Sequence, residues 1–374
     1  MKLVLATGIY PPDIGGPATY CYHFAEEFSR RGIAVSVVTY GESSEQKQYP
    51  VRPVSRRIPQ IIRQAYYGFM LMREARGADG IIAFDSLGAG LPAMLAGKIR
   101  RIPVVMRLGG DFVWEKYIER GGVPCTMREF YERKRYRSSR TLIALVAFVL
   151  RRVTMVVFTT SFQRELFVRY YRLERSRTAV RQNVFVKKIG QAGGASSAGL
   201  LWAGRFLKLK NISFLIEVYR YVRVRAKRQA QLVLVGDGPE KESIAQEIRK
   251  RGLQKEVRLA DTMSPSELAA AIRKAYCGIL PSLTEISPNF ALECVSEGVP
   301  AVITAETGIR EMLPELLYAD PRSVQEFGDA VVRLIDDGDF YRAYIRRIAG
   351  IRYHKSWEEA ADEYLALFHS LSNV

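Results

Sequence analysis

Strand-length apolar runs alternate with amphipathic helical patterns along most of the chain, and this alternation limits its fold more than any other feature. The pattern is typical of parallel β-sheets covered by helices on both faces. The clearest strands are expected at residues 2–7, 34–39, 80–84, 104–108 and 155–159, and again at 199–203, 231–235, 257–259, 278–281 and 301–304. A chain of 374 residues has room for two such sheets. The sequence therefore predicts an α/β protein with two doubly wound domains.

A stretch rich in Gly, Ser and Ala separates the two series of strands and is the best linker in the sequence. We expect an N-terminal domain at residues 1–188, a linker at 189–198, a C-terminal domain at 199–352 and a final segment at 353–374. In that segment, Ser356 and Glu359 have the spacing of a capping box, which marks the start of a helix. The apolar positions that follow predict that this last helix is amphipathic.

The cysteine, histidine and hydropathy patterns exclude several classes of protein. Four scattered cysteines and three histidines give no zinc-ligand cluster, and a reducing compartment is the simplest interpretation. The apolar run at the start ends in Pro-Pro-Asp after about seven residues and is too short for a signal peptide. The most apolar stretch is interrupted by Arg151 and Arg152, whereas a membrane span needs about 20 predominantly apolar residues. We therefore expect a cytoplasmic protein that does not span a membrane.

The net charge of +17 is confined to the first half, where residues 1–190 hold 32 basic and 15 acidic residues and the rest is neutral. In residues 55–76, apolar side chains recur at helical spacing beside five arginines, which suits either a helix at a membrane surface or, as favoured here, a helix that covers the sheet. Residues 128–140 hold six basic residues and suit anionic lipid headgroups. We hypothesise peripheral attachment to the inner membrane face. Nucleic acid is not expected as a partner, because the positive charge is the only feature that supports it.

Three loops at the carboxyl ends of the expected strands carry candidate ligand-binding residues. In the first, Gly15 and Gly16 precede a helix whose N-terminus favours a phosphate, although a plain turn explains these glycines as well. The loop is not Gly-x-Gly-x-x-Gly, so a nicotinamide cofactor is disfavoured. In the second, Arg205 and Lys210 follow the strand that opens the C-terminal domain. Two cations at this spacing suit a diphosphate, and the alternative is a solvated turn.

The third loop, GILPSLTEISPNFALECVSEGVPAVIT, is the most specific. Ser287 is a natural N-cap and Pro288 suits the first helical position, so the next backbone N–H groups are available to a phosphate. Glu285 lies in the loop before this helix, and Glu293 lies about one and a half turns inside it. A helix packed between strands is usually buried, so an acid at position 293 needs a reason, such as hydrogen bonds to two ribose hydroxyls. Either glutamate alone is more often a solvated residue.

Taken together, these motifs resemble the retaining nucleotide-sugar glycosyltransferases of the GT-B fold, specifically glycosyltransferase family 4. The resemblance covers nearly the whole chain. Its motifs are PPDIGGPATY near the start, TSFQRE at Ser161, Asn183, GRFLKLKN, GDGP at residues 236–239, Glu-x7-Glu from Glu285 to Glu293, TGIRE at residues 307–311 and the Ser-Trp-Glu of the last helix. It implies a GT-B fold with two Rossmann-like domains facing each other across a cleft and a last helix that returns to the N-terminal domain.

The resemblance also implies roles for individual residues. Arg205 and Lys210 would hold the donor diphosphate, Glu285 would contact the donor sugar, Glu293 the ribose, and Gly16 would approach the phosphates from the N-terminal domain. The expected donor-binding set is Gly15, Gly16, Arg205, Lys210, Glu285, Ser287, Asn289, Phe290, Ala291 and Glu293, and the expected catalytic set is Glu285, Arg205, Lys210 and Asp111. No metal or other cofactor is expected, because the two cations and the helix N-terminus would stabilise the leaving diphosphate.

Two departures from the family pattern bear on the function. The usual Gly-Phe-Gly after the first glutamate is replaced by residues 286–288, Ile-Ser-Pro, which stiffens the sugar loop. The family often has a His after the fourth strand, where this chain has residues 107–111, RLGGD. Asp111 stands in for that His and contacts the acceptor hydroxyl or the donor sugar, or else it caps a helix.

We expect a retaining, metal-independent hexosyltransferase that uses a nucleoside diphosphate sugar, a UDP-sugar in preference to a GDP-sugar. The acceptor would be a hydroxyl of an anionic or lipid-linked glycan precursor at the membrane surface, as in the synthesis of a cell-envelope polysaccharide. The alternative is a non-catalytic scaffold or partner subunit that has the GT-B fold and binds a nucleotide.

Overall fold

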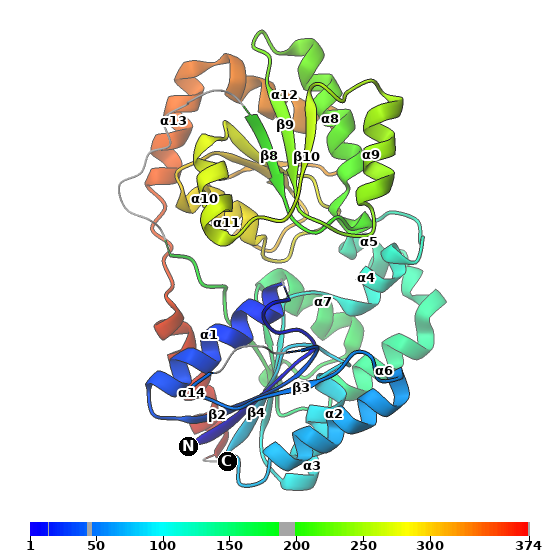
Figure 1. The fold of residues 1–374 in the computed structure, drawn as a ribbon, viewed down its shortest axis with the longest axis vertical. Coiled ribbons are helices and arrows are strands. Elements are labelled where there is room, and N and C mark those ends of the chain that lie inside the picture. The colour runs from blue at the N-terminus through cyan, green and yellow to red at the C-terminus, as the bar shows by residue number, and fades with distance from the viewer. Residues whose placement is uncertain (14, 43–46, 187–198, 373–374) are drawn as a thin grey trace. The chain divides into compact units, whose positions relative to one another are not determined.

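The computed structural model describes residues 1–13, 15–42, 47–186 and 199–372 (Figure 1). The linker expected at 189–198 lies outside these residues. The chain forms two compact units. The first comprises Met1–Val113, Lys134–Val184 and Lys355–Val374, and the second comprises Trp114–Arg133 and Phe185–His354.

The first unit is built on a seven-stranded parallel sheet with the strand order β3-β2-β1-β4-β5-β6-β7. Its strands are β1 (Lys2–Thr7), β2 (Ala34–Tyr40), β3 (Val51–Val54), β4 (Gly80–Ala83), β5 (Val104–Leu108), β6 (Met155–Phe158) and β7 (Thr178–Val180). The main helices are α1 (Gly16–Arg30), α2 (Gln60–Glu74), α3 (Gly90–Arg100), α6 (Arg140–Leu150), α7 (Ser161–Tyr171) and α14 (Trp357–Ser372), and the 3-10 helices are η1 (Arg135–Ser139) and η2 (Arg175–Arg177). Helices cover both faces of the sheet, which explains why the central strands are continuously apolar (Figure 1).

The second unit is built on a six-stranded parallel sheet with the strand order β10-β9-β8-β11-β12-β13. Its strands are β8 (Gly199–Ala203), β9 (Gln231–Val235), β10 (Val257–Ala260), β11 (Cys277–Leu280), β12 (Ala301–Thr304) and β13 (Leu317–Ala319). Its helices are α8 (Ile212–Arg225), α9 (Lys241–Lys250), α10 (Pro265–Lys274), α11 (Asn289–Ser296), α12 (Val324–Asp336), α13 (Gly338–Ala349) and the 3-10 helix η3 (Lys208–Lys210). Most of α4 (Phe112–Glu119) and all of α5 (Met127–Glu132) also belong to this unit, although they lie between β5 and α6 in the chain.

The prediction of two doubly wound parallel sheets is confirmed, and every predicted strand is present to within one residue at each end. Three further strands, β3, β7 and β13, were not predicted. Each has three or four residues and lies at an edge of its sheet, where one side has no neighbouring strand. These strands are only partly buried, so they lack the buried apolar runs that mark the central strands.

The final helix α14 forms as its capping box predicts. The Glu359 N–H donates to the Ser356 hydroxyl (3.1 Å), and the Ser356 N–H donates to the Glu359 carboxylate (2.6 Å). The helix packs against α1 in the first unit, where the rings of Phe24 and Tyr364 lie 4.8 Å apart. Its Phe368 lies directly on β4, since a Cβ at Gly80 would come within 2.2 Å of that ring.

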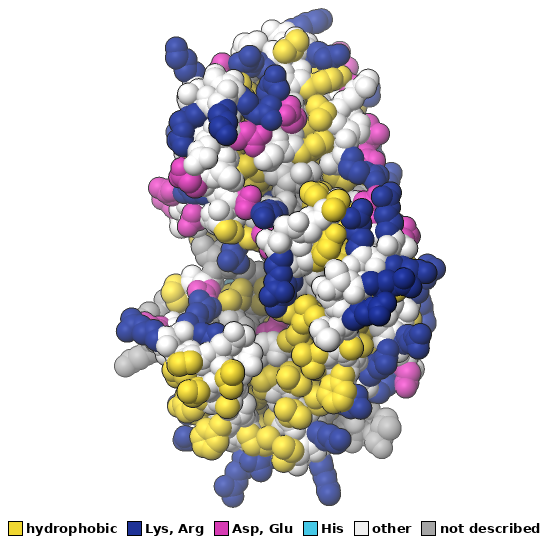
Figure 2. Space-filling view, turned by 90° about the vertical axis from the view of Figure 1, so that its right-hand side faces the viewer, with side chains coloured by type: hydrophobic (Ala, Val, Ile, Leu, Met, Phe, Trp, Pro, Cys, Tyr) yellow, Lys and Arg dark blue, Asp and Glu magenta, His cyan; other side chains and the backbone are white. Residues whose placement is uncertain are grey.

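Helix α2 packs on β1, β2 and β3, as the favoured prediction has it, but its apolar stripe faces solvent, so the expectation that this stripe contacts the sheet is wrong. Tyr67 and Leu71 are the apolar residues that α2 buries, whereas Ile61 is 84% exposed and Phe69 62% exposed. The exposed apolar side chains of the neighbouring helices α3 and α6 lie over the same part of the unit (Figure 2). Together they form what we call the apolar face: Ile61, Ile62, Tyr66, Phe69, Leu95, Ile99, Leu145 and Phe148.

Within the part of the chain that the structure describes, no helix combines the length and apolarity needed to cross a bilayer. The four cysteines are buried and not disulfide-bonded.

Candidate active site

A partly buried ion pair joins two loops at the carboxyl end of the second sheet. Lys210 ends η3 in the loop after β8, and Glu285 lies in the loop after β11. The Lys210 ammonium nitrogen Nζ lies 2.6 Å from Glu285 Oε1, and the same oxygen accepts a 2.6 Å hydrogen bond from the Ser282 hydroxyl. The Glu285 side chain is only 10% exposed and that of Lys210 25%. Because the pair is shielded from water, each charge depends on the other for its solvation.

Backbone hydrogen bonds fix the loop that carries Glu285. The Glu285 N–H donates to the carbonyl of Glu306 (2.9 Å), and its carbonyl accepts from the N–H of Gly308 (3.0 Å). Two residues earlier, the Leu283 N–H donates to the carbonyl of Leu209 (3.0 Å). The loops after β8, β11 and β12 are thereby joined to one another, and the ion pair is held by the protein itself.

Arg205 lies in the turn directly after β8 and is exposed. This turn packs closely against the GDGP turn after β9. A Cβ on Gly236 would lie 2.0 Å from the carbonyl oxygen of Gly204, and a Cβ on Gly238 would lie 2.5 Å from that of Phe206. Both glycines also have positive φ angles, +135° and +153°. The GDGP motif therefore supports the turn that presents the Arg205 guanidinium to solvent.

Helix α11 begins one residue later than the sequence predicts. Pro288 occupies the N-cap position and no side chain caps the helix, so the prediction that Ser287 is its N-cap is wrong. The first turn comprises Asn289, Phe290 and Ala291, of which the last two are buried. Backbone N–H groups in the first turn of a helix have no acceptor within the helix, and the helix dipole favours an anion there. Binding of a phosphate at the first turn of α11 stays a prediction.

Glu293 is exposed on α11, whereas its neighbours Leu292 and Cys294 are buried. The expectation that packing buries position 293 is therefore wrong, because α11 turns this position outward. An acid at this position requires no special explanation from packing, and its contact with a ribose stays a prediction.

The segment that contains α4 and α5 packs against both loops of the ion pair. At the end of α4, the Glu119 carboxylate accepts hydrogen bonds from the N–H groups of Lys208 (3.4 Å) and Leu209 (3.2 Å). At the start of α5, the Met127 N–H donates to the hydroxyl of Thr284 (2.8 Å), and this contact is buried. The segment thus orders the two loops from outside.

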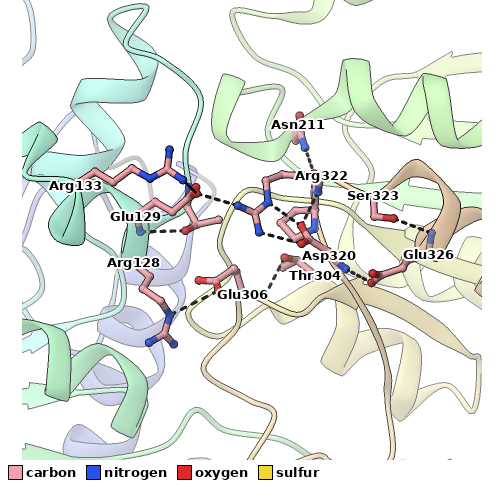
Figure 3. A network of polar contacts seen from close by, with 12 residues as sticks. Arg128, Glu129, Arg133, Asn211, Thr304, Glu306, Asp320, Arg322, Ser323 and Glu326 are labelled. Carbon is pink, nitrogen blue, oxygen red and sulfur yellow. Dashed lines mark hydrogen bonds and ion pairs between the residues drawn. The ribbon is translucent and has the colours of Figure 1, made fainter.

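Charged side chains of α5 extend this contact (Figure 3). Arg322 donates to Glu129 (2.8 Å) and to Asp320 (2.9 Å), and its hydrogen bond holds the pKa of the Asp320 carboxyl below its usual value. Arg128 Nε lies 3.6 Å from a carboxylate oxygen of Glu306, whose pKa is raised by burial. In Figure 3, the loops after β12 and β13 meet α5 through this network.

The first unit holds the remaining predicted residues. Gly15 precedes α1, which begins at Gly16. A Cβ on Gly15 would lie 2.7 Å from the side chain of Ile9, whereas a Cβ on Gly16 would meet nothing within 4 Å. Local packing therefore explains the first glycine, and the approach of a phosphate to the second stays a prediction.

Asp111 is 1% exposed and precedes α4. Its Oδ1 accepts a 2.9 Å hydrogen bond from the N–H of Val113. This is the geometry of an N-cap, so the helix-cap alternative is confirmed. A contact between Asp111 and an acceptor stays a prediction.

Arg107, in the segment that replaces the family's His, is buried and makes its contacts within the first unit. It donates to the side-chain oxygen of Asn183 (2.6 Å), and its guanidinium carbon lies 3.5 Å from the ring centre of Tyr20. Such a stacked cation stabilises the packing. Among the described residues, no cluster of three or more His, Cys, Asp or Glu has a geometry that could hold a metal ion.

Two family models match the chain, one in each half. The model described as Glycosyltransferase Family 4 matches residues 14–184, and the model described as Glycosyl transferases group 1 matches residues 197–337. The chain belongs to glycosyltransferase family 4. The fold of this glycosyltransferase is GT-B, as its structural neighbours and its two Rossmann-like sheets show.

Relatives of this glycosyltransferase match it over different shares of their length. A glycosyltransferase of Methanocaldococcus jannaschii, MJ1607, is 22% identical over 97% of this chain and 96% of that protein. The α-D-kanosaminyltransferase of Streptomyces kanamyceticus is 28% identical over 45% of this chain and 44% of that protein. Among solved structures, Anabaena HepE in complex with UDP superposes with a TM-score of 0.75 at 18% identity, and the lipopolysaccharide glycosyltransferase WaaG with 0.69 at 14%. The HepE match covers all of both chains, and the WaaG match covers 98% of this chain and 99% of WaaG.

In this glycosyltransferase the structure brings Lys210 and Glu285 into contact, and it places Arg205 in the turn that precedes η3. Sequence reasoning missed the supporting residues Ser282 and Glu119. Ser282 lies three residues before Glu285 in the same loop, so its nearness in sequence is the one signal that could have pointed to it. Glu119 had no such local signal, since its partners lie about 90 residues away in the chain.

Proposed function

We propose that this glycosyltransferase transfers a sugar, with retention of configuration, from a nucleoside diphosphate sugar to a hydroxyl of an anionic or lipid-linked acceptor. The observation that carries the proposal is the partly buried Lys210–Glu285 pair at the carboxyl end of the second sheet, where Glu285 lies four residues before α11. A cation suits the diphosphate and a carboxylate suits a sugar hydroxyl. Solved structures of the neighbour HepE, in complex with UDP and with UDP-glucose, support UDP as the nucleotide.

In this proposal the donor diphosphate is held by Lys210, Arg205 and the first turn of α11. Lys210 uses one of its three N–H donors on Glu285, which leaves two for phosphate oxygens. Arg205 is exposed and offers a planar fork to the same group. Glu285 accepts both of its hydrogen bonds on Oε1, so among the described residues Oε2 has no donor and suits a sugar hydroxyl. Glu293, exposed on α11, would accept from the ribose.

The reaction breaks the bond between the sugar C1 and the diphosphate oxygen, and that oxygen keeps the electron pair. The acceptor hydroxyl attacks C1 from the same face, and its proton passes to the leaving phosphate. The new negative charge develops on the diphosphate, next to Lys210 and Arg205, where fixed positive charge lowers the barrier most. Because these groups stabilise the leaving group, the proposal requires no metal ion and no protein base.

A thermal-shift titration tests the donor site. UDP, GDP, ADP and CMP are titrated against the wild type and against the variants Arg205→Ala and Glu293→Ala. A nucleotide at about 100 times its Kd adds about 2.7 kcal/mol of stability. We expect stabilisation by UDP in the wild type and its loss in both variants. Arg228→Ala, which removes an exposed arginine elsewhere in the same unit, serves as control.

Two outcomes of this titration would contradict the proposal. Stabilisation that survives in both variants would mean that the nucleotide binds away from α11 and the turn after β8. No stabilisation by any nucleotide would favour a non-catalytic scaffold that has the same fold.

We further propose that the apolar face of the first unit rests on an anionic membrane. Exposed arginines and lysines lie on these helices or within three residues of their ends: Arg57, Arg73, Arg76, Lys98, Arg100 and Arg140. Apolar side chains surrounded by basic ones suit the boundary between headgroups and acyl chains. Each basic residue near an anionic surface contributes about 1 kcal/mol, so six are enough for peripheral attachment.

Vesicle co-sedimentation tests this attachment. The wild type should co-sediment at low salt with vesicles that contain phosphatidylglycerol, and much less with pure phosphatidylcholine. The double variant Ile61→Ser/Phe69→Ser should bind about 100-fold more weakly, because two apolar side chains no longer leave water. Val224→Ser removes a 77% exposed apolar residue from the second unit and should change nothing. Equal binding by the double variant and the wild type would contradict the proposed attachment through the apolar face.

A further inference from the structure

The first unit contains a cavity of about 220 Å³ at the carboxyl ends of three neighbouring strands, β1, β2 and β4. Gly8 follows β1, Tyr40 ends β2, and Gly88 lies in the loop after β4. This end of a doubly wound sheet, at the point where the strand order reverses, is where such sheets bind ligands. The cavity is remote in sequence from every donor-binding residue of the second unit.

Arginine side chains line the open side of the cavity. Arg56 precedes α2 and Arg63 lies in its first turn, and Gln64 completes this wall. Arg63 donates to the carbonyl of Arg56 (2.8 Å), and its guanidinium carbon lies 5.7 Å from the ring centre of Tyr40. Among the described residues it contacts no carboxylate. Arg63 is therefore a cation at a cavity whose charge is not balanced by the part of the chain that the structure describes.

The two nearby carboxylates are occupied. Asp13 pairs with Arg56. Asp85 lies directly behind Gly8 of the cavity wall, since a Cβ on Gly8 would come within 3.1 Å of the Asp85 Oδ2. Its carboxylate accepts hydrogen bonds from the N–H groups of Leu87 and Ala89, which orient it toward the loop after β4. Burial also raises the pKa of the Asp85 carboxyl, so this group opposes an anion less than an exposed aspartate would.

We infer that this cavity binds the phosphate group of a phosphorylated acceptor. The inference rests on the proposed function and deepens it by naming the charged group of the acceptor and the residues that recognise it. The cavity wall offers the guanidinium of Arg63, the N–H donors of Arg56 that its pair with Asp13 leaves unused, and the amide donors of Gln64. A phosphate has oxygens enough to accept from all of them, and paired guanidiniums suit a doubly charged group better than a single carboxylate.

The position of the cavity fits an acceptor. The Asp13–Arg56 pair ties its rim to the loop that leads to Gly15 and Gly16, the loop expected to approach the donor phosphates. The cavity also adjoins the N-terminal end of α2, where the apolar face begins at Ile61. A phosphate carried by a lipid and a phosphate on a soluble sugar therefore both fit this position, and the chemistry they share is the phosphomonoester or diphosphate group.

Titration calorimetry on the full chain tests the inference, with glucose 6-phosphate and glucose as matched probes. Vesicles of phosphatidylcholine with and without phosphatidic acid form the second arm. Arg63→Gln should weaken binding of the phosphorylated probe about tenfold or more, because a charged hydrogen bond is lost. Arg169→Gln is the matched control, since it removes the same charge from an exposed position of the first unit, on α7. Arg205→Ala shows whether phosphate binds at the donor site instead.

Binding of glucose 6-phosphate that Arg63→Gln loses and Arg169→Gln keeps supports a soluble phosphate. The same pattern with phosphatidic acid vesicles alone supports a lipid headgroup. Equal binding of glucose and glucose 6-phosphate, equal losses in both arginine variants, or no binding of either phosphorylated probe would overturn the inference. Nucleotide stabilisation should persist in Arg63→Gln, so a failure here is distinguishable from a failure of the donor site.

Discussion

Replacement of Lys210 by Met should lower the transferase rate by at least about 100-fold, because a fixed donor to the developing negative charge is lost. The same change should also destabilise the second unit. Glu285 would remain a carboxylate with a 10% exposed side chain, still bonded to Ser282 but without its cation. Removal of one partner from a buried pair costs about 3–5 kcal/mol, and the partial exposure of Lys210 reduces our expectation to about 2 kcal/mol.

The double variant Lys210→Met/Glu285→Gln separates these two effects. The amide of a glutamine still accepts from Ser282 and carries no charge that needs a partner. We therefore expect urea denaturation to show stability close to that of the wild type, while the transferase rate stays low. If the double variant regained activity together with stability, Lys210 would be a structural residue and the proposed role at the diphosphate would be wrong.

This pair also shows how far the sequence alone could lead. Lys210 and Glu285 were predicted as site residues from their places after strands β8 and β11, and parallel strands bring their carboxyl ends to one edge of a sheet. That the two side chains bond to each other was not predicted. Their contact depends on the backbone bond from Leu283 to Leu209, and hydropathy patterns carry no information on how two loops pair.

The pattern of apolar residues gave the helices but not always the face they bury. In α2 the apolar stripe contains Ile61 and Phe69, and the usual rule places such a stripe on the sheet. The helix instead buries Tyr67, whose hydroxyl donates to the carbonyls of Thr7 and Val38. Because its hydroxyl bonds to carbonyls of β1 and β2, the Tyr67 side chain can lie in the interior. The periodicity of apolar residues does not predict such a hydrogen bond.

The α4–α5 segment was beyond sequence reasoning for a different reason. Its residues follow β5 in the chain, so continuity assigns them to the first half. Glu119, Met127 and Glu129 make their contacts with residues 208–209, 284 and 322. Membership of a compact unit is decided by such long-range contacts, and a single sequence shows none of them.

Replacement of Gly236 by Ala adds one methyl group to the GDGP turn after β9, and we expect it to destabilise the second unit strongly. The new Cβ would lie 2.0 Å from the carbonyl oxygen of Gly204, a backbone atom that cannot turn aside as a flexible side chain can. The φ angle of +135° adds a conformational cost for any L-residue. We expect a loss of about 3 kcal/mol or more, since the turn after β8 must move.

Gly252→Ala isolates the conformational part of that cost. Gly252 has a φ of +65° and a Cβ there would meet nothing within 4 Å, so only about 1 kcal/mol should be lost. Denaturation of the two variants measures the difference, and a nucleotide titration measures its consequence. Because the displaced turn presents Arg205, Gly236→Ala should also lose nucleotide stabilisation, whereas Gly252→Ala should keep it. Equal stability of the two variants would mean that the turns after β8 and β9 separate easily, and that the GDGP motif does not position Arg205.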